Sequence, residues 1–260
     1  MKKLKLFLVP VLLLLCGAQA LDGTGDSWQI DNPDKGNVDT YSICAWLKPT
    51  ASPASDAILF GYGKGISSST GTGWDVALRT DMTIRWNGYN AGSAAFSTSS
   101  LALTAGSWQH VCFVREGTFQ HKIYVDATDS TADETLSIDV GATILSTDDF
   151  VVGKALALDF SGYANYTGAM AHVAYYNNDI TGAEVASLAN KGTCPDSIAT
   201  NSADLEVFLK MTNGAAVTDS STNAFTVTES GNPTDDGGPG GLPCDGAVDN
   251  LPILQAIGED

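Results

Sequence analysis

The sequence predicts an all-β protein, a sandwich of two antiparallel sheets with one short helix near the C-terminal third. Short runs rich in β-branched and aromatic residues recur with turn-forming residues between them, which is typical of sandwich domains. Two of these runs, 41–47 and 108–114, each have a cysteine near their centre. Opposed residues of a non-hydrogen-bonded antiparallel pair have Cα atoms about 4.5 Å apart, and a disulfide spans about 4.4–6.8 Å. Cys44 and Cys112 therefore fit a bond between neighbouring strands that are distant in sequence.

The first twenty residues are expected to be a secretory signal peptide. Three lysines precede an apolar stretch over residues 6–15, which is too short to span a bilayer. Ala18-Gln19-Ala20 then has the small residues of a cleavage site. A lipid anchor on Cys16 is a less favoured alternative, because Leu14 and Leu15 stand where a lipoprotein signal usually carries small residues. The protein is therefore expected to be secreted and extracellular.

The remaining cysteines are Cys44, Cys112, Cys194 and Cys244. An even number in an exported chain predicts disulfides, and four cysteines allow three pairings. If Cys44 joins Cys112, the other bond joins Cys194 to Cys244. The alternative, four buried thiols, is less favoured because an oxidising compartment promotes the bond.

The chain is strongly acidic. Loss of the three leader lysines would bring the net charge from -17 to about -20. Such a surface repels nucleic acid and anionic membranes, so neither is an expected partner. Beyond the leader no apolar stretch approaches membrane length, so no transmembrane segment is expected.

The sequence predicts one helix, which begins after Thr181, and eleven strands. Thr181-Gly182-Ala183-Glu184 is a capping box, followed by an apolar stripe and by Gly192 as a stop. Asn87-Gly88 predicts a tight hairpin turn, and residues 67–73 a surface loop. The strand candidates are residues 27–30, 40–48, 57–62, 74–78, 83–86, 107–115, 122–125, 150–153, 169–175, 205–211 and 224–228.

Three segments follow from these patterns. Residues 1–20 are the signal peptide and residues 21–231 form the sandwich domain. Residues 232–260 are a Gly/Pro/Asp-rich tail without expected regular structure. A bond between Cys194 and Cys244 would tie this tail back to the domain.

Several motifs resemble one family when taken in order. Residues 21–28 look like its opening strand, 41–49 its second strand, and 108–114 with 122–126 its central hairpin. Residues 168–176 leading into the capping box look like its last strand and short helix. The chain thus resembles LamG-like jelly-roll domains of the concanavalin A-like lectin/glucanase superfamily, which includes laminin G domains and pentraxins, over residues 21–230. In pentraxins a disulfide joins the two strands that match Cys44 and Cys112.

The resemblance implies glycan chemistry without a catalytic pair. Glycosidases of this superfamily place two carboxylates on one strand as E-x-D-x-x-E, and this motif is absent. The six glutamates are scattered, and Glu184 caps the helix. The protein is therefore not expected to be an enzyme. His110, His121 and His172 have no metal-binding spacing and are expected to be packed or surface residues.

One calcium site is a candidate. Pentraxin calcium loops carry several carboxylates and amides, whereas the matching loop here keeps one acid, Asp159. Asp159 and Asn165 bracket residues 160–164, and side-chain oxygens with loop carbonyls suit Ca²⁺. The alternative is a plain Asx turn without a metal.

Four aromatic residues are candidates for stacking on sugars. Tyr163 and Tyr166 lie in the same loop as the calcium candidate, and Trp86 and Tyr89 flank the expected hairpin turn. Their alternative role is packing in or beside the core. The sequence therefore predicts a secreted, non-catalytic module that binds a carbohydrate or glycoprotein ligand through its loops, with calcium assisting. The alternatives are a structural or adhesive surface component and, less favoured, a glycoside hydrolase.

Overall fold

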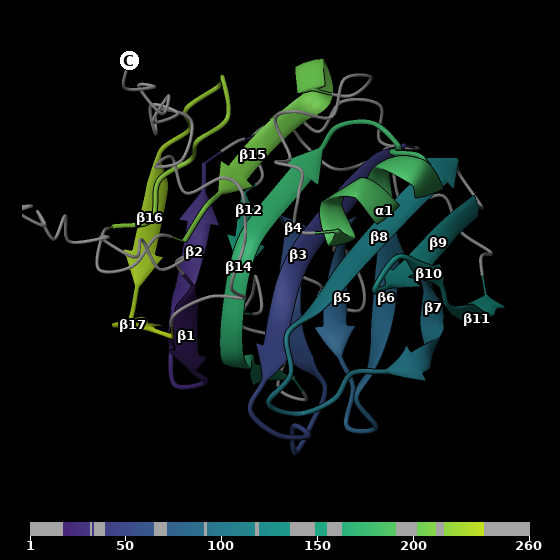
Figure 1. The fold of residues 1–260 in the computed structure, drawn as a ribbon, viewed down its shortest axis with the longest axis horizontal. Helices are drawn as coiled ribbons and strands as arrows, with labels where there is room; N and C mark the ends of the chain where they lie inside the picture. The colour runs from purple at the N-terminus through teal and green to yellow at the C-terminus, as the bar shows by residue number, and fades with distance from the viewer. Residues whose placement is uncertain are drawn as a thin grey trace, which may run out of the picture.

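Two antiparallel sheets pack face to face and form the body of the protein (Figure 1). The computed structural model describes residues 18–31, 33, 40–64, 72–90, 93–117, 120–135, 149–154, 163–190, 202–211 and 216–236. Within these residues, a single short α-helix accompanies the strands. The predicted all-β sandwich is confirmed.

The first sheet has eight strands and lies toward the viewer in Figure 1. In spatial order its strands are β10 (Thr128–Asp129), β9 (Gln120–Val125), β8 (Gln109–Gly117), β3 (Tyr41–Pro49), β14 (Thr167–Tyr176), β1 (Gln19–Asp22) and β17 (Thr234–Asp235), with β15 (Leu205–Leu209) paired to the C-terminal half of β14. A 3₁₀ turn, η3 (Ser202–Asp204), precedes β15.

The second sheet has nine strands. In spatial order they are β11 (Thr131–Thr135), β7 (Ser93–Ala102), β6 (Thr83–Asn90), β5 (Thr72–Leu78), β4 (Ala57–Lys64), β12 (Phe150–Val152), β2 (Ser27–Ile30) and β16 (Val227–Ser230), with β13 (Ala164–Asn165) parallel to the start of β4.

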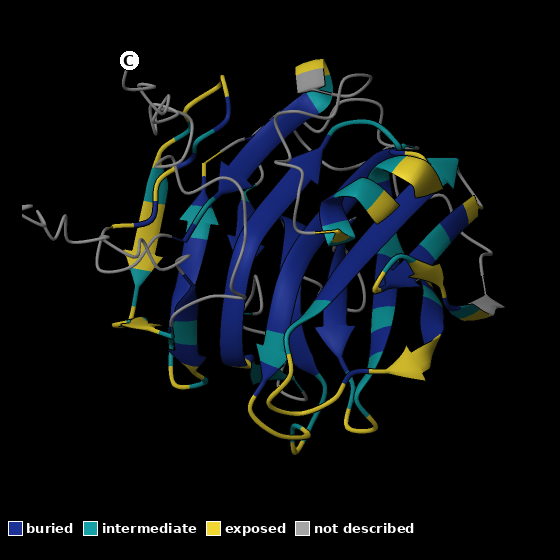
Figure 2. Ribbon diagram, viewed as in Figure 1, coloured by how far each residue is buried: buried dark blue, intermediate teal, exposed yellow. Residues whose placement is uncertain are grey.

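The core between the sheets is dominated by aromatic side chains. Tyr41 of the first sheet stacks on Trp74 of the second, with ring centroids 4.8 Å apart. Phe113 and Trp86 stack in the same way at 5.4 Å. Large aromatics bury much apolar area with few rotatable bonds, so these pairs hold the sheets together strongly. The central strands are accordingly almost entirely buried (Figure 2).

The helix α1 (Gly182–Ala189) covers the outer face of the first sheet. Thr181 and Glu184 form the predicted capping box. Val185 and Leu188 are buried in a second apolar cluster with Val114 and Phe208. The helix ends at Ala189 with Asn190 as its C-cap, and the predicted stop, Gly192, lies outside the described residues.

The disulfide predicted between neighbouring strands is present. Cys44 of β3 and Cys112 of β8 are directly opposed, with Cα atoms 4.1 Å apart, and their sulfurs are bonded. The bond lies in the second apolar cluster, beneath the helix. Cys194 and Cys244 lie outside the described residues.

The turn predicted at Asn87-Gly88 is wrong, because both residues lie inside β6. A tight hairpin turn of that type needs a positive φ at both residues, and neither has one. Asn87 instead pairs with Asp75 of β5, and Gly88 lies opposite Trp74. Asn87 therefore has a side-chain partner across the sheet, and the strand continues to Asn90.

The predicted domain limits fall close to strands at both ends. Gln19 and Ala20, assigned above to the signal peptide, are the first half of β1. Thr234 and Asp235, assigned to the tail, form β17. Among the described residues, no helix has the length and apolar character needed to cross a membrane.

Candidate functional site

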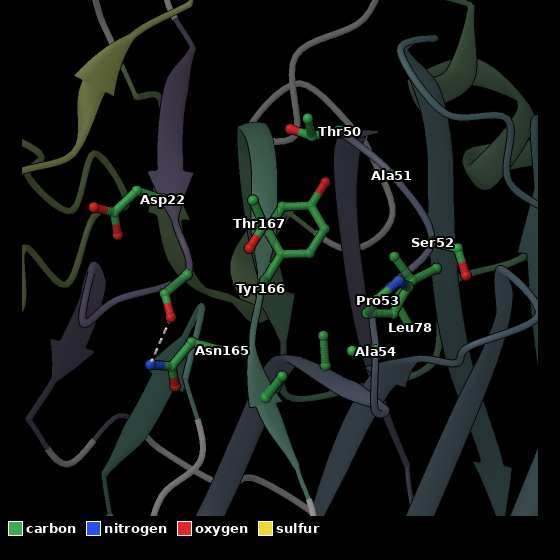
Figure 3. A pocket seen from close by; sticks show the side chains of 13 residues that line it. Asp22, Thr50, Ala51, Ser52, Pro53, Ala54, Leu78, Asn165, Tyr166 and Thr167 are labelled. Carbon is green, nitrogen blue, oxygen red and sulfur yellow. Dashed lines mark hydrogen bonds between the residues drawn. The ribbon is translucent and has the colours of Figure 1, made fainter.

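A pocket lies where β1 and β3 end and β14 begins. These strand ends lie at the lower end of the sandwich in Figure 1. Its volume is about 330 Å³, near the lower limit of about 300–1,000 Å³ for small-molecule sites. Figure 3 shows most of its lining side chains. The lining residues are Asp22, Gly23, Thr50, Ala51, Ser52, Pro53, Ala54, Ala57, Leu78, Ala164, Asn165, Tyr166 and Thr167.

Backbone hydrogen bonds hold the two walls of this pocket together. The Thr50 amide donates to the carbonyl of Thr167 at 3.2 Å, which ties the loop after β3 to the start of β14. The Ala164 amide donates to the carbonyl of Asp56 at 2.9 Å, which ties the end of the same loop to β13. The loop of residues 50–56 is thus anchored at both ends across the pocket.

Asn165 lies on the wall opposite that loop. Its Nδ2 donates to the carbonyl of Gly23 at 3.3 Å (Figure 3). Gly23 has a φ of 79°, and a Cβ there would collide with the hydroxyl of Thr167, so only glycine lets this turn approach so closely. The sequence predicted Asn165 as a calcium ligand. In the structure it lies in the wall of this pocket, where its other amide atom, Oδ1, is an oxygen acceptor.

Asp22 is the only carboxylate among the described residues of the pocket lining. Its Oδ1 accepts hydrogen bonds from the hydroxyl of Thr24 at 2.6 Å and from the Thr24 amide at 2.7 Å. These bonds hold the pKa of the Asp22 carboxyl below its usual value. The pocket rim therefore carries a negative charge at neutral pH.

Tyr166 forms part of the inner wall. Its side chain is fully buried, and its hydroxyl donates to the carbonyl of Ala169 at 3.3 Å. Burial raises the pKa of this hydroxyl, which stays neutral. Tyr166 thus has the packing role that the sequence analysis gave as the alternative to sugar stacking, although it also lines the pocket.

Tyr163 and Tyr89 meet beside the pocket, on the outer face of the second sheet. Their hydroxyl oxygens are 3.4 Å apart and both side chains are half-buried. Tyr163 directly precedes β13, whereas Tyr89 comes from β6. The structure therefore brings together two of the four aromatic candidates and joins them to the pocket through residues 163–165.

A buried carboxyl lies near these tyrosines. Asp75 alternates with the core residues Trp74 and Val76, so it lies on the outer face of the sheet. It is nevertheless only 2% exposed, and burial raises its pKa to about 7. The Asn87 amide donates to its Oδ1 at 2.7 Å and partly offsets this shift.

The other carboxylate oxygen of Asp75, Oδ2, is buried without a good hydrogen-bond donor among the described residues. Among the described residues none donates to Oδ2 with hydrogen-bonding geometry, although the nearby Tyr89 hydroxyl also lowers the pKa. Arg85, stacked over Phe96 at 4.6 Å, lowers it through its charge. The sequence missed Asp75, because a polar residue between two apolar ones in a strand normally faces water.

Trp86 lies inside the protein. Its indole N–H donates to the hydroxyl of Tyr41 at 2.9 Å, and its ring packs on Phe113. This is the packing role that the sequence left as its alternative. His110, His121 and His172 are likewise buried, as expected for packed histidines.

The described residues offer few metal ligands. Asp159, the other half of the calcium prediction, lies outside them. Within the described part, the one group of three or more close His, Cys, Asp or Glu ligand atoms is Cys44, His110 and Cys112, whose sulfurs form the disulfide. Ca²⁺ takes about 6–8 oxygen ligands. The side chains of Asp22 and Asn165 fall short of that number, so the described residues alone do not form a calcium site.

A two-sheet jelly roll with a helix on one outer face and a small pocket of mixed polar and apolar lining at its loop end defines a lectin-like sandwich. Residues 22–186 match the model of the concanavalin A-like lectin/glucanases superfamily. The chain belongs to this superfamily, which confirms the family resemblance of the sequence motifs.

Solved structures share the fold at low sequence identity. A putative carbohydrate-binding protein from Bacteroides ovatus superposes with a TM-score of 0.62 at 14% identity, covering 86% of this chain and 60% of that one. The native heptameric SAP-like pentraxin from Limulus polyphemus has a TM-score of 0.55 at 13% identity, covering 83% and 95%. A CBM40 of an IT-sialidase from Ruminococcus gnavus, bound to α2,3-sialyllactose, has a TM-score of 0.52 at 12% identity, covering 66% and 96%.

No curated protein matches this sequence. At these identities the solved structures establish the fold, whereas the ligand must be argued from the residues of this chain.

Proposed function

We propose that the protein is an exported, non-catalytic module that binds glycans or glycoconjugates in the pocket at the end of its sandwich. The observation that carries this proposal is the lining of the pocket: a small cavity with a carboxylate, an amide and hydroxyls beside a wall of small apolar residues. Sugars have the matching mixture of hydroxyl groups and C–H faces. The leader-like N-terminus and the Cys44–Cys112 disulfide support export.

The pocket chemistry favours a neutral sugar at the end of a chain. Its volume of about 330 Å³ suits one sugar ring better than a long polymer. Asp22 and Asn165 line the pocket and would bind sugar hydroxyls, whereas Ala51 and Ala54 would contact apolar ring faces. Since Asp22 stays ionised and the chain has a net charge of -17, sialylated and uronic glycans should bind less well.

The single carboxylate also supports a non-catalytic role. Glycoside hydrolysis generally needs an acid and a second carboxylate about 5–9.5 Å apart. Among the residues that the structure describes, the pocket lining holds Asp22 and no second acid. A glycoside hydrolase, the least favoured alternative, would need a partner acid from outside this lining.

We propose calcium as an assisting ion rather than a required one. The candidate ligands are Asp159 and Asn165, and Asn165 is in the pocket wall. If Ca²⁺ bound there, it would supply extra coordination to sugar hydroxyls. Comparing binding in calcium with binding in EDTA tests this role directly.

A glycan array probed with the exported protein tests the proposal. We expect binding to neutral chain ends that is stronger than binding to their sialylated counterparts. The Ala54→Trp variant would fill the pocket mouth and abolish binding, because Ala54 is an exposed lining residue. The matched control is Ala186→Trp, at an exposed position of α1 on the other sheet, and it should bind normally.

Two results would contradict the proposal. Binding that survives Ala54→Trp places the ligand elsewhere. An array without any bound glycan favours the second function expected from the sequence, a structural or adhesive surface component.

A further inference from the structure

The first half of β1 holds the C-terminal strand of the first sheet. β17 pairs with β1 through two residues only, Gln19 opposite Asp235 and Ala20 opposite Thr234. Among the described residues, β1 is the only strand that pairs with β17. Without Gln19 and Ala20 this end of the chain would lose its whole strand partner.

The same two residues extend β1 along β14. Gln19 lies opposite Met170 and Ala20 opposite Ala169, while Leu21 and Asp22 continue the ladder. Gln19 is only 5% exposed, so it is an integral part of the sheet. A chain that began at Leu21 would keep half of β1 and no partner for β17.

The sequence analysis placed the cut after Ala20, and this requirement favours a second candidate site two residues earlier. Signal peptidases need small residues one and three positions before the cut. Ala18 and Ala20 satisfy this rule for a cut after Ala20, whereas Cys16 and Ala18 satisfy it for a cut after Ala18. The second cut leaves Gln19 as the first residue, and Gln19 is where β1 begins.

We propose that the leader is removed by hydrolysis of the Ala18–Gln19 peptide bond, so that the mature protein begins at Gln19. One water is consumed: the leader leaves with the new carboxylate of Ala18, and Gln19 receives the α-amino group. The mature chain thereby keeps β1 whole, together with Asp22 and Gly23 of the pocket wall that follows it.

The local charges suit this new end. In the uncut chain Ala18 is fully buried in an apolar cluster with Trp46 and Ala171, and the Asp236 amide donates to its carbonyl at 3.1 Å. Cleavage removes this packing and this bond. In return, the ammonium group of Gln19 is created next to β17, whose Asp235 lies opposite Gln19. Asp236 is held nearby by an ion pair with Lys48, 2.8 Å long. Acidic neighbours stabilise the positive charge of the new terminus.

Mass spectrometry of the exported protein tests the proposal. The complete chain is expressed in a host with a general secretion pathway, and the N-terminal peptide of the exported product is sequenced. We expect Gln19 at the terminus, with or without loss of ammonia by cyclisation. A terminus at Leu21, or a lipid-modified Cys16, would overturn the proposal.

Two further experiments make the result specific. The Ala20→Leu variant removes the small residue needed for a cut after Ala20 but leaves the cut after Ala18 possible, so its terminus should still be Gln19. Chains released from a carrier so that they begin at Gln19 or at Leu21 should differ in thermal midpoint by several degrees, the shorter being less stable. Equal midpoints would show that residues 19 and 20 add nothing to the fold and would contradict the structural basis of the proposal. None of these readouts depends on a sugar.

Discussion

The Asp75 carboxylate accepts a 2.7 Å hydrogen bond from the Asn87 amide, across β5 and β6 and shielded from water. This hydrogen bond does not offset the cost of burying the charged carboxylate, since burial still raises the pKa of Asp75 to about 7. Asp219 is a useful contrast. It is buried as well, yet its carboxylate accepts from the amides of Phe208, Ser221 and Phe225. Two buried acids therefore have opposite consequences for stability.

Asp75→Asn should stabilise the protein at alkaline pH. The folded pKa of Asp75 is about 7, whereas an unfolded aspartate has a pKa of about 3.9. Its proton is therefore bound more tightly in the native state, and stability falls as pH rises from about 4 to about 7. The neutral variant avoids this loss, which is at most about 4 kcal/mol at pH 8. Urea unfolding at pH 5 and pH 8 measures the gain.

The control for Asp75 is Asp81→Asn. Asp81 is an exposed turn residue whose carboxyl has its pKa lowered by hydrogen bonds from Thr83. Its replacement should therefore add no stability between pH 5 and pH 8. If Asp75→Asn gains no more at pH 8 than at pH 5, Asp75 is not a buried, proton-binding acid.

Asp219→Ala should be strongly destabilising at neutral pH. It would leave three backbone amides without their acceptor, two of them buried, at a cost of about 3 kcal/mol or more. Asp129→Ala is the control, because among the described residues its carboxylate bonds only Thr131, in an exposed turn, and the change should cost under about 1 kcal/mol. Chemical denaturation compares them, and similar losses would mean that the Asp219 network adds little.

His121→Phe should protect the protein against acid. His121 packs against both Trp86 and Phe113, with ring centroids 5.2 and 5.4 Å away, and burial lowers its pKa to about 4. Because the folded pKa lies below the unfolded value of about 6.5, stability is lost as pH falls toward 4. The phenylalanine should recover up to about 3 kcal/mol at pH 4 and change little at pH 8. A thermal midpoint that shows the same shift at both pH values would contradict this.

Removal of the disulfide should destabilise the protein, because the unfolded chain gains conformational entropy when the crosslink is lost. Cys44 and Cys112 are 68 residues apart, and closing a loop of that length is worth about 4 kcal/mol in the chain-entropy model. The Cys44→Ala, Cys112→Ala double variant should therefore unfold at lower denaturant concentration than the parent. Adding a reducing agent should lower the midpoint of the parent by more than that of the double variant, which keeps only the predicted Cys194–Cys244 bond as a target. An equal response of both chains would locate the reductant's effect in another bond.

Much of the fold was accessible from the sequence because apolar periodicity and composition mark buried strands. β2 was predicted with its observed bounds, and the capping box located α1. β7 escaped because Ser93–Ala102 is made of small and polar residues around one aromatic, Phe96. β1 escaped because Ala18-Gln19-Ala20 also fits a cleavage motif, and such motifs are judged without knowledge of pairing partners.

The site was only partly predictable, since its parts converge from distant segments. Asn165 and Tyr166 drew attention as a loop, but Asp22 and Thr50 lie in the pocket through pairing that no local pattern encodes. Trp86 shows why an aromatic residue alone does not predict a sugar site. A tryptophan can stack on a sugar or pack in the core, and the alternation of side chains along β6 directs Trp86 into the core. Asn87 was wrongly assigned to a turn, because its side chain instead donates to the carboxylate of Asp75 in the neighbouring strand β5.

The segment that carries Tyr163 and Asn165 is continuous, with one residue between them. A molecule that displaced Asn165 from Gly23 would therefore also shift Tyr163 relative to Tyr89, whose hydroxyl it meets. A change in tyrosine difference absorbance on titration would therefore signal occupancy without any label. A Tyr163→Phe chain, still able to bind, would give a weaker signal.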